Sequence, residues 1–176
     1  MERIVVSDTN ILIDLVSIGL LDDFFELPIE VHTTDMIVLE IENSEQMDAI
    51  KHLISSNRLI VKSFSPKEMS DLLVLYADAS KRTNVSIQDC SVWHYAQKNN
   101  YVLLTGDMKL RKMVISTGVE VHGILYVFDL MLKHGVIAPK KAIDKLRALY
   151  NINNRLPEKE IEKRLVFWAS IKGKNI

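Results

Sequence analysis

The sequence predicts an α/β fold in which a mostly parallel, twisted sheet of four or five strands lies between two layers of helices. Three observations support this fold. Short apolar segments that are typical of strands alternate with longer segments of helical spacing. The strand segments lack a clear polar face, as expected when both faces of a parallel sheet are covered. Glycines stand where several of the predicted helices end.

The first half of the chain predicts three strands and the helices between them. The β-branched run at 3–7 is predicted to be a buried strand, and 10–27 has helical spacing that Gly19 interrupts, which indicates two helical pieces. The alternating segment 29–34 is predicted to be the second strand, and Thr34 or Asp35 is expected to cap a helix that runs from Met36 onward. The segment 58–64 is the third predicted strand.

The second half predicts two further strands and a helical end. Ser65-Pro66 starts a helix with Glu68 in its first turn, and Ser86 caps the helical segment 87–99. The other predicted elements are a strand at 101–105, a helix from Asp107 to Gly118, a strand at 119–123, and helices at 124–134, 139–150 and 158–171. We therefore expect one domain at 1–135, followed by a helical C-terminal extension at 136–176 that packs on it or flanks it.

Composition restricts the class of protein. The chain has 176 residues, of which 48% are hydrophobic and 26% charged, as in a folded soluble protein. No apolar run approaches the roughly 20 residues that cross a bilayer, and the run after the charged N-terminus is too short for a signal peptide. The single cysteine, Cys90, cannot form an internal disulfide. These features predict a cytoplasmic protein with no membrane partner.

Charge is distributed unevenly along the chain. Residues 139–176 contain ten Lys or Arg and four Asp or Glu, about +6, so the other 138 residues hold 22 − 10 = 12 basic and 23 − 4 = 19 acidic groups, about −7. An acidic body with a basic end can serve a polyanionic partner. A pair of solvated helices would have the same composition, and both interpretations stay open.

Two acidic residues follow strands of the predicted sheet. Asp8 comes directly after the first strand, and Asp107 comes after "YVLLT" and a Thr-Gly corner. In open α/β sheets the functional crevice lies beyond the carboxyl ends of the strands. The two carboxylates therefore converge if these strands are neighbours.

Each of these acids also has a purely structural explanation. Asp8 and Asp107 are suited to cap the helices that follow them, and Asp89 is suited to form a capping box with Ser86. Glu40 differs, because the sequence places it in the middle of a predicted helix, where no cap is needed.

Taken together, the four acids predict a metal site. Converging carboxylates repel one another unless cations are present, and Mg²⁺ or Mn²⁺ are the usual partners of such oxygen ligands. Bound ions of this kind support phosphoryl transfer. The five histidines lack zinc-ligand spacing, and the chain contains no P-loop, no G-x-G-x-x-G and no G-x-S-x-G motif.

Four segments in series resemble the PIN domain, the fold of many metal-dependent ribonucleases, which include the toxins of type II toxin–antitoxin modules. The segments are "VVSDTNILIDL", "IVLEIE", "SIQDCSVWHYAQKNNYVLLTGDMKLRK" and "VEVHGILYVFDLM", which together span about residues 3 to 135. The resemblance implies a carboxylate cluster that binds one or two Mg²⁺ or Mn²⁺ ions. One position departs mildly from the family pattern, because "SIQD" carries Gln88 where a small residue is commoner.

The resemblance also assigns roles to residues. It implies that Asp8, Asp89 and Asp107 hold metal and that Glu40 binds a second ion or positions the attacking water. Asn10 and Thr105 are the implied supporting residues: Asn10 holds the carboxylates or a bound water, and Thr105 supports Asp107. Three basic residues just beyond Asp107 are weaker candidates for contacts with nucleic acid, and as exposed helix charges they are equally well explained as passive: Lys109, Arg111 and Lys112.

The sequence thus predicts a Mg²⁺- or Mn²⁺-dependent endoribonuclease, with the toxin of a type II toxin–antitoxin module as its expected context. The expected partners are an RNA substrate, an antitoxin protein and a second copy of the chain, for which the apolar faces of the helices at 10–27 would supply the interface. One alternative is a non-catalytic module that binds RNA or protein. A phosphatase of the haloacid-dehalogenase type fits less well, because that family needs a second Asp where this chain has Asn10.

Overall fold

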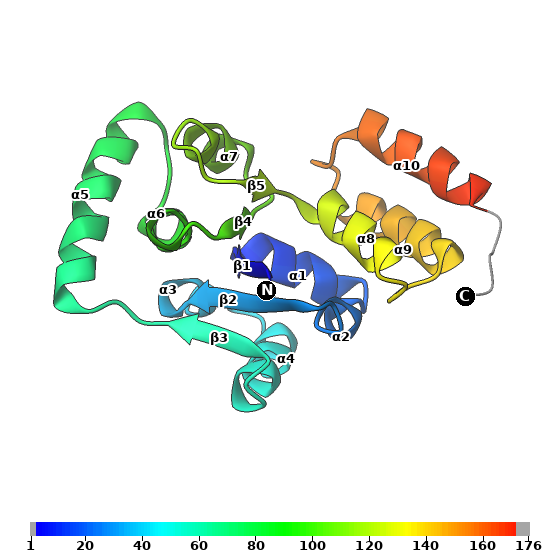
Figure 1. Ribbon diagram of the computed structural model, residues 1–176, viewed down its shortest axis with the longest axis horizontal. Coiled ribbons are helices and arrows are strands. Elements are labelled where there is room, and N and C mark those ends of the chain that lie inside the picture. Colours follow the sequence, from blue (N-terminus) through cyan, green and yellow to red (C-terminus); the bar gives the residue numbers. More distant parts are fainter. Residues whose placement is uncertain (1–2, 172–176) are drawn as a thin grey trace. The chain divides into compact units, whose positions relative to one another are not determined.

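The computed structural model describes residues 3–171 and contains two compact units (Figure 1). The first unit comprises Met1–Ile13 and Pro28–Ile124, and the second comprises Asp14–Leu27 and Leu125–Ile176. The boundary therefore falls inside helix α1 (Thr9–Ser17) and again at the start of α8 (Ile124–Lys133). The sequence-based boundary at residue 135 stays a prediction, and the last five residues of the expected extension lie outside the described residues.

The first unit is built on a five-stranded parallel sheet, as predicted. Its strands are β1 (Arg3–Ser7), β2 (Ile29–Thr34), β3 (Leu59–Lys62), β4 (Val102–Leu104) and β5 (Val121–His122). The order in the sheet is β3-β2-β1-β4-β5, and each neighbouring pair is parallel. The chain builds outward from β1 to β3 and then returns to β4 on the other side of β1. The two sides meet at the carboxyl ends of β1 and β4, which is where α/β sheets bind ligands.

Five helices belong entirely to this unit, and α1 and α8 have their first residues in it. The five are α3 (Asp35–Val38), α4 (Ser44–Ser55), α5 (Pro66–Arg82), α6 (Ile87–Asn99) and α7 (Met108–Ile115). Helix α6 contacts β1, β2 and β4, whereas α4 contacts β3. Sequence signals for helix starts are confirmed: Ser65 and Ser86 each form a capping box, and Asp107 caps α7.

One predicted helix is wrong in its extent. The segment from Met36 onward was expected to continue past Glu40, but α3 ends at Val38 and a new helix, α4, begins after Asn43. The Asn43 side chain accepts a hydrogen bond from the backbone N–H of Gln46 at 3.0 Å, which starts α4 independently. Glu40 therefore lies in the turn after α3 instead of in the middle of a helix.

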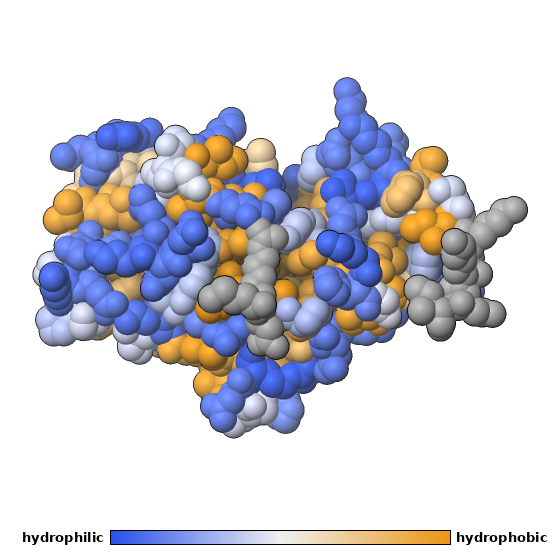
Figure 2. All heavy atoms as spheres, in the orientation of Figure 1, coloured by the Kyte–Doolittle hydropathy of each residue, from blue (hydrophilic) through white to orange (hydrophobic). Residues whose placement is uncertain are grey.

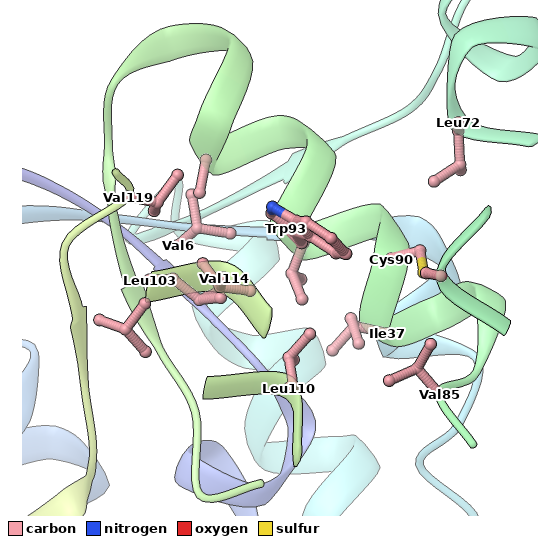
Figure 3. Close-up of a cluster of buried hydrophobic side chains, with 14 residues drawn as sticks. Val6, Ile37, Leu72, Val85, Cys90, Trp93, Leu103, Leu110, Val114 and Val119 are labelled. Carbon is pink, nitrogen blue, oxygen red and sulfur yellow. The ribbon is translucent and has the colours of Figure 1, made fainter. Parts of the chain in front are cut away.

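The core of the first unit lies between the sheet and helices α3, α5, α6 and α7. Figure 3 shows Trp93 of α6 among side chains from the strands and from α7, including Val6, Leu103 and Val114. Trp93 is only 5% exposed and its indole N–H donates to the Thr117 hydroxyl at 3.3 Å. Trp93 is therefore a core residue. This packing fixes β1 and β4, the strands that precede Asp8 and Asp107.

The second unit is helical. It contains the end of α1, α2 (Leu21–Phe24), most of α8, α9 (Pro139–Ile152) and α10 (Glu158–Ser170). Gly19, at φ +63, interrupts the helical segment between α1 and α2, as the sequence predicted. Leu15, Leu20 and Phe24 are fully buried within the single chain. These side chains of the expected dimer interface are covered by the chain itself, and the homodimer stays a prediction.

Several basic residues of this unit are bound by groups of the same unit. Lys141 pairs with Asp23 at 2.7 Å, and Arg164 pairs with Asp129 at 2.8 Å. Lys145 donates to the backbone carbonyl of Ile18 at 2.5 Å. These contacts are consistent with a packed helical pair, and the role of the basic extension in binding a polyanion stays a prediction.

The visible surface mixes hydrophilic and hydrophobic residues without a continuous apolar band (Figure 2). No helix in the described part of the chain combines the length and the apolar character that a bilayer-spanning segment needs.

Candidate functional site

Asp8 lies at the end of the central strand, and its carboxylate is held from three directions. The register pairs Ser7 with Leu104, so the residues that follow β1 and β4 are neighbours. The Thr105 hydroxyl donates to Oδ2 of Asp8 at 2.8 Å, and the Thr9 N–H donates to Oδ1 at 2.7 Å. The side-chain amide of Asn10 lies 3.4 Å from Oδ2. Asp8 is only 2% exposed. The orientation of this carboxylate is therefore fixed by the fold.

Glu40 is connected to Asp8 through Thr9. The Thr9 hydroxyl donates to Oε2 of Glu40 at 2.9 Å, while the backbone N–H of the same residue binds Asp8. Glu40 itself is exposed, so the carboxylate that faces solvent is anchored by a buried hydroxyl. The sequence did not identify Thr9 as a site residue. The only available signal was a hydroxyl side chain directly after the strand-end Asp.

Asp89 and Asp107 both cap helices. Asp89 closes the capping box of α6, since Oδ2 accepts from the Ser86 N–H at 2.8 Å and the Asp89 N–H donates to the Ser86 hydroxyl at 2.9 Å. Oδ1 of Asp107 accepts from the N–H groups of Lys109 and Leu110 at 2.6 and 3.1 Å. The structural explanation of each residue is thus correct, although capping leaves part of each carboxylate available for other contacts.

Thr105 connects Asp107 to Asp8. Its hydroxyl oxygen accepts from the Asp107 N–H at 3.1 Å and donates its own proton to Asp8. The side chain of Thr105 is fully buried, so this hydroxyl has no water to replace either contact. We refer to Asp8, Glu40, Asp89 and Asp107, with Thr9 and Thr105 between them, as the acidic site.

Three of the four carboxylates influence one another electrostatically. Burial raises the pKa of Asp8 to about 6, the hydrogen bonds from Thr105 and Thr9 oppose the rise, and the negative charges of Asp89 and Glu40 add to it. The pKa of Glu40 is also raised, first by desolvation and then by Asp89, against the hydrogen bond from Thr9. Asp8, Glu40 and Asp89 therefore share one region, whereas Asp107 joins it through Thr105.

The donor set of the acidic site suits a hard divalent cation. Carboxylate and hydroxyl oxygens surround Asp8. Burial and, to a smaller extent, neighbouring negative charges raise its pKa, and a bound cation would favour the ionised form. Within residues 3–171, however, no three Asp, Glu, His or Cys side chains come close enough to enclose a metal ion as they stand. Mg²⁺ commonly binds through one or two carboxylates and keeps several waters, so this arrangement fits such an ion.

The three basic candidates on α7 lie in different environments. Lys109 and Lys112 are exposed, whereas Arg111 is half-buried. Nothing in the described chain brings the two lysines into the acidic site.

The fold and this site define a class of protein: a parallel α/β domain with interacting carboxylates at the point where the strand order of the sheet reverses. A family model described as PIN domain matches residues 4–170. The chain belongs to the PIN domain family, and the resemblance drawn from the sequence is confirmed.

Comparison with solved structures supports the fold. PAE2754 from Pyrobaculum aerophilum is similar with a TM-score of 0.52 and 14% identity, over 78% of this chain and 100% of that chain. VapBC2 from Rickettsia felis, bound to a DNA fragment from its promoter, is similar with a TM-score of 0.50 and 16% identity, over 69% of this chain and 98% of that chain. A search of curated proteins finds no match.

Proposed function

We propose that this PIN domain is a divalent-metal-dependent endoribonuclease that hydrolyses phosphodiester bonds of RNA. The observation that carries the proposal is the buried Asp8 carboxylate, which the fold holds at the carboxyl edge of the sheet. Its pKa is raised by burial and, to a smaller extent, by the charges of two neighbouring acids. Keeping such a charge buried is costly to the fold, and perturbed groups of this kind are typical of functional sites. Family membership supports the same conclusion.

Asp8 is the principal residue for holding Mg²⁺ or Mn²⁺, and Asp89 and Asp107 complete the acidic surroundings. When bound, one or two such ions supply Lewis acidity and neutralise charge that develops on the phosphate oxygens. The two threonines keep Asp8 and Glu40 in fixed orientations, so that little rearrangement is needed when substrate arrives.

Glu40 has the properties of the group that orients the attacking water and accepts its proton. Its carboxylate is exposed, is anchored by Thr9 and has a raised pKa, which makes it a better proton acceptor than an ordinary glutamate. In this reaction the water oxygen bonds to phosphorus as the bond from phosphorus to the leaving ribose oxygen breaks. The proton of the water goes to Glu40, and the leaving oxygen takes a proton from solvent.

The physiological context that we propose is a type II toxin–antitoxin module, in which a partner protein would restrain the nuclease. The sequence resemblance to the toxin members of the family supports this context. The tests are biochemical and genetic: the neighbouring reading frame would have to encode a small protein that binds this chain and inhibits it.

The direct test of the activity uses a labelled single-stranded RNA with Mg²⁺, with Mn²⁺ or with EDTA. The wild-type protein should cleave the RNA only with metal, and Asp8→Asn should abolish cleavage and remain folded by circular dichroism. Full activity of Asp8→Asn would refute the proposed site.

A non-catalytic module that binds RNA or protein is the second candidate, because Asp89 and Asp107 already serve as helix caps. The two functions differ in their response to metal. Binding of Mn²⁺ to the native state must raise the melting temperature. No shift at millimolar Mn²⁺, together with no cleavage of RNA, would favour the non-catalytic function.

A further inference from the structure

Arg111 differs from the other basic residues of α7 in the position of its guanidinium. A Cβ atom added at Gly123 would lie 3.1 Å from Nη1 of Arg111 and 3.6 Å from the backbone oxygen of Thr105. The guanidinium therefore lies against the turn between β5 and α8, in space that exists because residue 123 has no side chain. The backbone of Gly123 is outside the left-handed region, so a special backbone conformation does not explain the glycine.

This position is at the edge of the acidic site. The Thr105 N–H donates to the backbone oxygen of His122 at 2.9 Å, which joins the end of β4 to the end of β5. The hydroxyl of the same Thr105 binds Asp8. Thr105 thus lies between the Arg111 guanidinium and the Asp8 carboxylate, and the guanidinium is on the side of Thr105 that faces β5.

The charge of Arg111 has no acidic partner in the described part of the chain. Arg82 pairs with Asp78 and Arg164 pairs with Asp129, but no Asp or Glu between residues 3 and 171 forms an ion pair with Arg111. Holding a guanidinium half-buried without a counter-charge costs free energy. An external anion would offset that cost, and a guanidinium matches the paired oxygens of a phosphate diester.

We propose that Arg111 binds a backbone phosphate of single-stranded RNA adjacent to the phosphate that is cut, and that Gly123 is a positioning residue that keeps the space for its guanidinium open. The choice of RNA rests on the proposed function. The inference separates Arg111 from Lys109 and Lys112, which the sequence grouped with it. It also predicts that the RNA strand passes from the acidic site toward the end of β5.

The test measures RNA binding without cleavage, so that it does not depend on activity. A fluorescein-labelled 12-nucleotide single-stranded RNA is titrated with the protein in EDTA, in an Asp8→Asn background, at several salt concentrations. The variants are Arg111→Gln, Arg111→Lys, Gly123→Ala and the double variant of Arg111→Gln with Gly123→Ala. The control is Lys51→Gln, which removes one exposed charge from the second half of α4, the helix that leads into the amino end of β3.

Loss of one charged contact should weaken binding by about tenfold for Arg111→Gln, and the slope of log affinity against log salt should fall by about 0.7. Arg111→Lys should retain the salt slope but bind more weakly, because a lysine cannot form the paired contact. Lys51→Gln should change affinity by less than about twofold, since exposed charges distant from the ligand are screened.

The double variant tests the role of Gly123. Gly123→Ala should weaken binding alone but add nothing to Arg111→Gln, because both changes act on one contact. The inference would be overturned if the losses of affinity from Gly123→Ala and Arg111→Gln added in the double variant. It would also be overturned if Arg111→Gln bound RNA as tightly as Lys51→Gln, or if the protein bound no RNA. If Arg111→Gln melts early, Arg111→Lys and Gly123→Ala carry the test. The variants could bind RNA as expected while the wild-type protein fails to cleave it. That outcome would refute the proposed nuclease activity and would leave the proposed contact between Arg111 and RNA unaffected.

Discussion

Replacing Asp8 by Asn should remove much of the pH dependence from the stability of the metal-free protein. The pKa of Asp8 is raised from 3.8 to about 6 in the folded protein, so the native state binds this proton more tightly than the unfolded chain. Stability from this group is therefore fully present below pH 3.8 and is lost as the pH rises through about 6. At 1.36 kcal/mol for each pH unit, the full loss is about 3 kcal/mol.

The assay is urea denaturation of wild type and Asp8→Asn in EDTA at pH 8 and pH 4.5. Between these two conditions, the linkage relation gives a change of about 2 kcal/mol in the stability difference between the two proteins. Groups that titrate in both proteins cancel in this comparison. Asp48→Asn, an equivalent change at an exposed aspartate of α4, should give a much smaller change.

Mn²⁺ should stabilise the wild type more than Asp8→Asn. A cation bound to the acidic site favours the ionised form of Asp8, so the wild type should gain stability and Asp8→Asn should gain much less. A stability difference that is the same at both pH values would refute the claim that burial and neighbouring charges strain Asp8. Equal stabilisation of both proteins by Mn²⁺ would separate Asp8 from metal binding.

Three other changes test the surrounding structure. Glu40→Gln should lower kcat for RNA cleavage by about 100-fold or more with little change in KM, because it removes a proton acceptor. Steady-state kinetics measures both constants, and a much smaller fall in kcat would contradict this role of Glu40. Thr105→Val should raise the pKa of Asp8 further, because it removes a hydrogen bond that lowers it, and should cost about 1 kcal/mol in urea denaturation; the pH profile of cleavage should move to higher pH, and an unmoved profile would contradict the assignment. Ser86→Ala removes the capping box of α6 and should cost about 1 kcal/mol, read as a lower melting temperature, with Ser116→Ala on the exposed end of α7 as a control of smaller effect.

The strands and most helix starts were predictable because their signals are local. Apolar runs indicated β1 and β4. Ser86, with Asp89 three residues later, indicated the start of α6. The end of α3 was not predictable in the same way, because the segment after Val38 contains no glycine or proline to interrupt the helical pattern.

The contacts within the acidic site depend on positions far apart in the sequence. Thr9 joins Asp8 to Glu40, and nothing in the sequence shows that the turn after α3 returns to β1. The space that the Arg111 guanidinium occupies depends on Gly123, which follows β5. Residue types predicted which acids to consider, while the hydroxyls and the open space around them required the fold.

The double duty of Asp89 and Asp107 has a consequence for reading related sequences. A related chain without nuclease activity would still gain stability from an aspartate at the start of α6 and α7, since both helix starts depend on it. The presence of both aspartates in a related sequence is therefore weak evidence that the protein is catalytically active. Asp8 and Glu40 contribute far less to the stability of the fold. Loss of activity would therefore be followed first by substitutions at these two positions.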